Sequence, residues 1–146
     1  MLALPVVSRR TIQPLILLHD RKECTMLGGI HTQRPGGHVH APASVTAGET
    51  FPVTVDVENR GARDGKQVVQ VYAERRDSVV DRPVRWLVGF APVRVPAGEK
   101  ARLEIGVPTR LLAYWQDGWR YDPGAYQLRA GTSAVDLPLA AEVELT

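Results

Sequence analysis

The sequence predicts an all-β fold, an antiparallel β-sandwich of about seven strands that occupies residues 41–146. Two observations lead to this prediction. Apolar and polar residues alternate along short segments, which is the pattern of strands with one buried face. Clusters of glycine, proline, asparagine and aspartate separate these segments about every ten residues, as in sandwiches whose short strands are joined by tight turns.

The first clear strand covers residues 51–58, where phenylalanine and valine at odd positions alternate with mostly polar residues. This period of two predicts a buried inner face and an outer face that carries Asp56 and Glu58. Asn59 and Gly61 follow as a turn, because both residue types tolerate backbone conformations that most side chains resist.

Three further strands are predicted from the next segments. Residues 66–74 alternate less strictly, which fits a more central strand. A third block runs from Val84 to Val95, and Gly89 before Phe90 indicates a bulge or a close backbone approach. Residues 101–107 alternate again and predict a strand with a polar outer face.

The last third of the chain contains a helical turn, a hairpin and two strands. Residues 108–112 begin with proline and predict one helical turn. Trp115 and Trp119 flank Gln-Asp-Gly, which predicts a hairpin tip. Residues 122–124 predict a tight turn into a strand through residue 130, and the apolar period of residues 135–145 predicts the final strand.

Residues 1–40 differ from the rest, because their short apolar patches are interrupted by proline and glycine and show no sustained period. They are predicted to form a poorly ordered, irregular leader, with a short helix or strand around residues 12–18. The leader has five basic and two acidic residues, whereas the remainder has thirteen and fourteen. The basic excess therefore belongs to the leader and not to the domain.

Composition argues against several classes of function. The net charge of +2 gives no reason to expect a nucleic-acid partner. No apolar run approaches the ~18–20 residues that span a bilayer, so no membrane partner is expected. The leader lacks the apolar region of a signal peptide, so the compartment is left open. Cys24 is the only cysteine, which excludes an intrachain disulfide.

Eight blocks of sequence carry a resemblance to a known family. They are residues 45–50, 55–61, 65–72, 82–90, 95–99, 112–115, 122–126 and 130–133. In order and spacing they resemble the fibronectin type III-like domain at the C-terminus of family 3 glycoside hydrolases, the β-glucosidases and their relatives. Each block is weakly specific alone, whereas the ordered set over residues 41–146 is specific.

This resemblance implies an immunoglobulin-like, fibronectin type III-like sandwich that acts as a non-catalytic accessory domain without a cofactor. It would brace the catalytic domains of a retaining hydrolase and present a loop near their substrate cleft. The nucleophile and acid/base residue of the family lie in those upstream domains, and this chain is too short to hold them. It would be a truncated C-terminus or an independent homologue. The alternative is a free-standing carbohydrate-binding or protein-interaction module.

No catalytic or metal site is predicted. Retaining hydrolysis needs two carboxylates about 5–5.5 Å apart in a cleft, whereas Asp56 and Glu58 share an outward strand face. His38 and His40 alternate on an extended segment near His31, without a carboxylate or cysteine at ligand spacing. The simpler interpretation is a solvated surface for the carboxylates and a flexible leader for the histidines.

Two pairs of residues are the candidate contact sites, for carbohydrate or for another domain. Trp115 and Trp119 are the aromatic residues most suited to exposure, because they lie at the predicted hairpin tip. Arg75 and Arg76 begin a loop of mixed charge whose counterpart in the family can approach the catalytic domains. The plainer alternatives are core packing for the aromatic residues and a solvated loop for the arginines.

Overall fold

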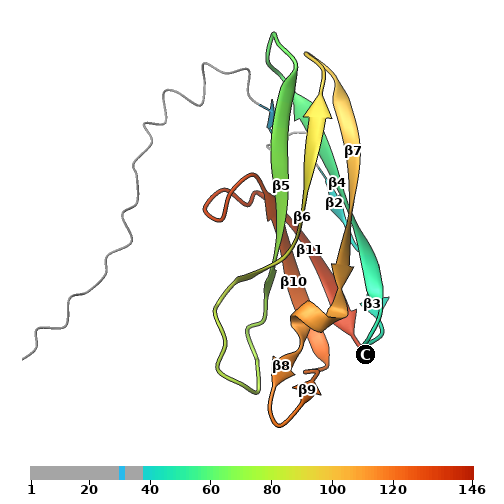
Figure 1. Cartoon of the computed structure of the whole chain (residues 1–146), viewed down its shortest axis with the longest axis vertical. Helices are drawn as coiled ribbons and strands as arrows, with labels where there is room; N and C mark the ends of the chain where they lie inside the picture. The colour runs from blue at the N-terminus through green and yellow to red at the C-terminus, as the bar shows by residue number, and fades with distance from the viewer. Residues whose placement is uncertain (1–29, 32–37) are drawn as a thin grey trace, which may run out of the picture.

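The computed structural model describes residues 30–31 and 38–146, which form two β-sheets packed face to face (Figure 1). In the first sheet, β4 (Thr50–Asn59) pairs along one edge with β7 (Lys100–Pro108). Its other edge pairs with two short strands, β1 (Ile30–His31) and β2 (Val39–His40). Both short strands fall in the segment predicted as the leader.

The second sheet has five strands in the order β3, β11, β10, β5, β6. All neighbours are antiparallel except β3 and β11, which are parallel. A 3₁₀ turn, η1, and a separate hairpin of two short strands follow β7. The bounds are Ser44–Val45 for β3, Gly65–Glu74 for β5, Trp86–Val95 for β6, Thr109–Leu112 for η1, Tyr114–Trp115 for β8, Trp119–Arg120 for β9, Gly124–Gly131 for β10 and Leu139–Leu145 for β11.

The core lies between the sheets and consists mainly of valine. The inner face of β4 is buried at each apolar odd position, as the period of two predicts. Facing it are Val69 and Val71 of β5 and Leu128 of β10, all fully buried. β-Branched side chains pack well on a pleated surface, so a valine-rich sequence of this period forms paired sheets and not helices. The predicted all-β sandwich is confirmed.

A bulge in β6 confirms the expectation attached to Gly89. The pairing of β5 and β6 shifts between Val71 and Tyr72, which leaves Val88 as an extra residue opposite β5. A Cβ atom on Gly89 would lie 2.9 Å from the Cγ2 atom of Ile105 in the facing sheet. Only glycine therefore permits this close approach.

The predicted start of the last strand is wrong. β11 begins at Leu139, and Val135 is 95% exposed in the preceding loop. This loop folds back on itself through a bridge between Ser133 and Asp136, so its apolar residues do not continue the sheet. Val84, grouped with the third strand, likewise lies before β6 and is 84% exposed.

Other predicted elements are confirmed. The predicted helical turn is η1, and the Gln-Asp-Gly segment is the tip of the β8–β9 hairpin. Asp117 and Gly118 at this tip both have positive φ, at 51° and 136°.

Residues 12–18, predicted as a short helix or strand, and Cys24 lie outside the described residues. No helix in the described part of the chain is long and apolar enough to cross a membrane.

Asn59 holds together the turns at one end of the sandwich. Its fully buried Nδ2 group donates to the carbonyl oxygens of Arg63 and Val95, each at 2.8 Å. Its Oδ1 atom accepts from the backbone N–H of Gly61 at 2.9 Å. One side chain thus satisfies polar groups of the β4–β5 turn and of the last residue of β6.

We predict that Asn59→Ala lowers the free energy of unfolding by about 2 kcal/mol or more, because it removes the donor to the buried carbonyl of Val95 and to the partly buried carbonyl of Arg63. Chemical denaturation of the full chain measures the change. Arg63→Ala is the control, because the hydrogen bond from Asn59 uses only the Arg63 backbone. A loss of less than 0.5 kcal/mol, roughly the size of a neutral surface change, would contradict the role given to Asn59.

We predict that Gly89→Ala costs about 1–3 kcal/mol, because the new methyl group overpacks the contact with Ile105. The matched control is Gly106→Ala in the facing strand, where a Cβ atom would meet only the Thr50 Cγ2 atom at 3.4 Å. Equal effects of the two substitutions on thermal unfolding would show that the inter-sheet approach at Gly89 is not tight.

Candidate interaction site at the loop end of the sandwich

Two candidate contact segments lie at the same end of the molecule. The β5–β6 loop, residues 75–85, and the β8–β9 hairpin lie side by side at the lower end of the molecule in Figure 1. Arg82 of the loop approaches the hairpin, because its guanidinium carbon lies 5.6 Å from the ring centroid of Tyr114 in β8. Its Nη1 atom also donates to the carbonyl oxygen of Leu112 in η1, just before the hairpin, at 3.1 Å. The structure therefore brings together residues that the sequence places some 40 positions apart. We call this region the loop end.

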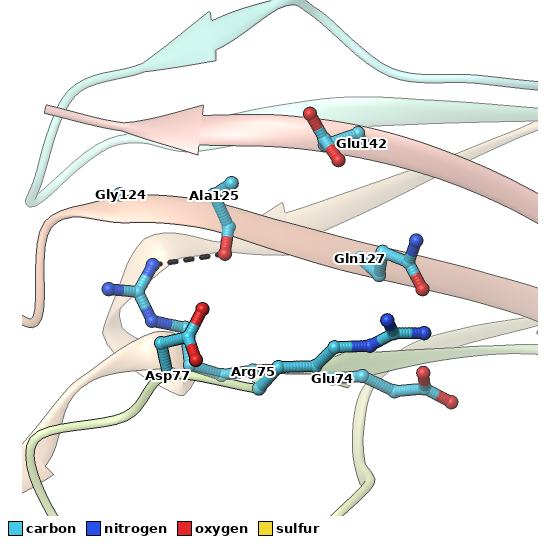
Figure 2. A pocket seen from close by; sticks show the side chains of 8 residues that line it. Glu74, Arg75, Asp77, Gly124, Ala125, Gln127 and Glu142 are labelled. Carbon is cyan, nitrogen blue, oxygen red and sulfur yellow. Dashed lines mark hydrogen bonds between the residues drawn. The ribbon is translucent and has the colours of Figure 1, made fainter.

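Arg75 is held inside the loop end by three acceptors. Its Nη1 atom donates to the carbonyl oxygen of Ala125 at 3.0 Å, as Figure 2 shows. Its Nη2 atom donates to the carbonyl oxygen of Pro123 at 2.7 Å and to the carboxylate of Asp122 at 3.2 Å. The guanidinium also lies 4.8 Å from the ring centroid of Tyr126. Arg75 is therefore engaged within the domain.

Asp122 is the buried carboxylate at the centre of this region. It accepts from Arg75 and, at 3.3 Å, from the backbone N–H of Val79 in the middle of the β5–β6 loop. Its own carbonyl oxygen accepts from the Tyr126 hydroxyl at 2.8 Å. This last bond is a tyrosine corner, in which a tyrosine early in a strand binds the backbone just upstream. Burial raises the pKa of the Tyr126 phenol, which keeps it a hydrogen-bond donor.

Arg82 fixes the far side of the same loop. Its guanidinium carbon lies 5.1 Å from the ring of Trp86 and 5.6 Å from the ring of Tyr114. The indole Nε1 of Trp86 donates to the carbonyl oxygen of Leu111 at 2.8 Å. These contacts tie the start of β6 to η1 and β8, so the loop and the hairpin form one bound unit.

Trp115 and Trp119 project from the hairpin. Their exposed fractions are 67% and 51%, and their rings meet edge to face with centroids 5.5 Å apart. The Arg110 guanidinium lies 4.8 Å from the Trp119 ring centroid. The two rings therefore support each other and form an exposed aromatic surface, as the sequence predicts for the hairpin tip.

A polar pocket of about 330 Å³ lies beside Arg75, on the outer side of the sheet (Figure 2). The exposed Arg76 and Asp77 line it from the loop, and Gln127 and Glu142 line it from neighbouring strands. Both arginines predicted as contacts line this pocket, but Arg75 is hydrogen-bonded within the domain, whereas Arg76 is exposed.

The carboxylates considered for catalysis are neutralised in ion pairs. Asp56 accepts from the Arg102 Nε atom at 2.8 Å, and this hydrogen bond holds the Asp56 pKa below its ordinary value. Glu58 pairs with Arg60 at 3.2 Å. An aspartate held ionised by arginine is a poor general acid, so the geometry gives no support to glycoside hydrolysis on this strand face.

The histidines do not form a metal site with their neighbours. The rings of His38 and His40 have centroids 5.9 Å apart. Among residues 30–31 and 38–146, no group of three or more His, Cys, Asp or Glu side chains is placed to hold a metal ion.

Sequence reasoning missed the residues that organise the loop end. Asp122 was recognised only as part of a tight turn, and Arg82 only as part of a motif. Their partners are 30 or more positions away in the sequence, so no local pattern identifies the pairing. One local signal does exist, because Tyr126 lies four residues after Asp122 at the start of a strand, the spacing of a tyrosine corner.

Comparison with known proteins gives the same family from sequence and from structure. Residues 67–134 match the family described as fibronectin type III-like domain. β-Glucosidase B of Emericella nidulans is 36% identical over 111 residues, which is 74% of this chain and 13% of the relative. Probable β-glucosidase I of Aspergillus terreus is 37% identical over 110 residues, 72% of this chain and 13% of the relative.

Solved β-glucosidases contain the same fold. DesR from Streptomyces venezuelae, a β-glucosidase crystallised with D-glucose, superposes with a TM-score of 0.68 at 31% identity. The match covers 75% of this chain and 14% of DesR. The GH3 β-glucosidase of Bifidobacterium adolescentis gives a TM-score of 0.65 at 32% identity, over 75% of this chain and 17% of that enzyme.

The chain spans about 13% of the length of the curated relatives it matches, and the matched part is the sandwich. The blocks of sequence, the two-sheet topology and the superpositions agree on one assignment. This chain contains a fibronectin type III-like domain of the kind found in family 3 β-glucosidases.

Proposed function

We propose that this domain braces the catalytic domains of a retaining, β-glucosidase-like hydrolase and performs no chemistry itself. The observation that carries the proposal is the exposed Trp115–Trp119 pair on a loop end whose segments are bound to the rest of the domain. Large aromatic side chains on a fixed support are typical of the anchors of protein interfaces.

The loop end combines a fixed geometry with an exposed apolar surface. Arg75 and Asp122 bind the loop to the turn before β10, and Arg82 binds it to η1, through partly buried hydrogen bonds. A surface that is ordered before binding loses less conformational entropy when a partner docks. The internal contacts therefore support a role in holding another domain in one orientation.

The four predicted contact residues divide into two roles in this proposal. Trp115 and Trp119 contact the partner domain, and Arg76 lies at the border of that contact beside the polar pocket. Arg75 acts as a positioning residue, because its donors are bound to the turn before β10. The catalytic carboxylates of the parent hydrolase lie outside this domain.

One observation favours a second function, a carbohydrate-binding module. Trp115 is 67% exposed, whereas the Trp119 ring is approached by both Trp115 and Arg110. An exposed indole beside polar groups of the hairpin is a suitable platform for a sugar ring. The brace is preferred because the relatives that contain this domain are much longer enzymes.

We predict that Trp115→Ala weakens the attachment of the domain to its partner by about 2 kcal/mol, as expected for an aromatic interface anchor. The test uses a fusion enzyme in which residues 38–146 replace the matched 111-residue segment of β-glucosidase B. The measured quantity is the half-life of β-glucosidase activity at a fixed elevated temperature. The same substitution in the isolated chain is expected to cost less than ~1.5 kcal/mol, the upper value of an aromatic pair.

The control is Val135→Ala, which changes a 95% exposed residue on the β10–β11 loop. Titration of the isolated chain with laminaribiose, followed by tryptophan fluorescence, tests the alternative. The carbohydrate-binding function would replace the brace if two results were obtained together. Laminaribiose would bind the isolated chain saturably and lose this binding in Trp115→Ala, while Trp115→Ala would leave the half-life of the fusion enzyme unchanged.

We predict that Arg75→Ala lowers the free energy of unfolding by about 2–4 kcal/mol, because it leaves the Asp122 carboxylate buried without its cation. Arg76→Ala is the matched control at the next position, where the side chain is exposed, and it is expected to cost under ~0.5 kcal/mol. Urea denaturation of both variants distinguishes a positioning residue from a surface contact. Equal, small effects would show that Arg75 does not organise the loop end.

A further inference from the structure

We infer that the outer face of β5 and β6 is a second docking surface of this domain. Its partner is the domain that precedes the sandwich in the parent hydrolase, through an apolar surface that carries carboxylates at its edge. The inference rests on the proposed function, because it names another place at which the brace is held. It concerns Val68, Leu87 and Phe90, which no part of the loop-end argument uses. We call these three residues the β5–β6 patch.

The three residues of the β5–β6 patch lie at successive outward-facing pairs of the two strands. Phe90 lies opposite Gln70, and Val68 lies opposite Pro92 two pairs further along. On the other side of the bulge, Leu87 lies opposite Tyr72. Phe90 is 64% exposed, and Leu87 and Val68 are exposed to a lesser extent.

The bulge at Val88 turns Phe90 outward. With an uninterrupted period of two, Phe90 would share the buried side of Trp86 and Val88. The extra residue reverses the phase, so that Gly89 faces the core and Phe90 faces outward. Bulges occur where a fold redirects a side chain, and here the redirected side chain is the largest exposed one on the sheet.

The charged rim of the patch indicates the chemistry of the partner. Lys66 and Arg94 are exposed and lie directly opposite each other at the end of the patch near the β4–β5 turn. Within the described residues, neither has an ion-pair partner. Like charges at opposed positions destabilise a strand pair, so carboxylates supplied from outside would be bound favourably.

The path of the chain indicates which domain binds there. β1 contacts β5 and pairs with the last residues of β4, next to the β4–β5 turn, so it lies at the end of the sandwich where β5 begins. Lys66 and Val68 lie on that same stretch of β5. In β-glucosidase B, 87% of the sequence lies outside the matched segment, which is ample for a domain that packs against this face.

The test is Phe90→Ser in the isolated chain and in the fusion with β-glucosidase B. In the fusion, loss of the buried ring is expected to shorten the half-life of activity about fivefold or more, which corresponds to roughly 1 kcal/mol. In the isolated chain, Phe90→Ser is expected to leave the unfolding midpoint unchanged. Val135→Ser, an equally drastic change at a 95% exposed residue, is the control in both.

Charge reversal tests the rim independently of the ring. Lys66→Glu combined with Arg94→Glu is expected to shorten the half-life of the fusion at low salt, with the difference reduced at high salt because exposed charges are screened. In the isolated chain, the same pair replaces two opposed cations by two opposed anions, so little change is expected.

The outcomes separate the two proposals. The first outcome is an unmodified fusion that is active and stable, with Phe90→Ser and charge-reversal variants whose half-lives match that of Val135→Ser. This outcome overturns the second docking surface and leaves the brace intact. An inactive or unfolded unmodified fusion counts against the brace, and the docking surface falls with it. A loss of stability caused by Phe90→Ser in the isolated chain would mean that this chain already covers Phe90, which also overturns the inference.

Discussion

The close contact between β6 and β7 at Gly89 is the constraint on which much of this domain depends. The two sheets pack closely enough there that a Cβ atom on residue 89 would lie 2.9 Å from Ile105. β6 meets this requirement with a glycine and with the extra residue Val88. The bulge then decides the direction of every later side chain in the strand. Phe90 consequently lies on the surface, where it can serve a partner.

The two ends of the sandwich are organised by buried polar groups of different kinds. At one end, the neutral amide of Asn59 closes the turns with two donated bonds and one accepted bond. At the other end, the carboxylate of Asp122 holds a long loop through Arg75 and the Val79 backbone. Each group binds the backbone of a segment that is distant in the sequence, so each end of the sandwich is fixed by contacts between distant parts of the chain.

Much of the fold could be predicted, because a half-buried strand leaves a local pattern that residues 51–58 display clearly. The hairpin tip between Trp115 and Trp119 was likewise visible, since Gln-Asp-Gly suits the positive φ angles found there. The predicted start of the last strand was wrong, because the apolar period of this strand already begins in the preceding loop. That loop folds back through the Ser133–Asp136 bridge and does not join the sheet. Periodicity reports which side a residue would face in a strand, not whether the strand has a neighbour to pair with.

The sequence by itself determined the sandwich class, the turns and the resemblance to the domain of family 3 glycoside hydrolases, because these depend on short-range pattern and ordered motifs. Only the tertiary structure decided that Arg75 is hydrogen-bonded within the domain while Arg76 is exposed, because the acceptors of Arg75 lie about 50 positions away in the sequence. The direction of Phe90 was decided in the same way. It follows from one unpaired residue, Val88, because strand pairing with β5 and the approach of β7 from the other sheet cannot be seen in a local pattern.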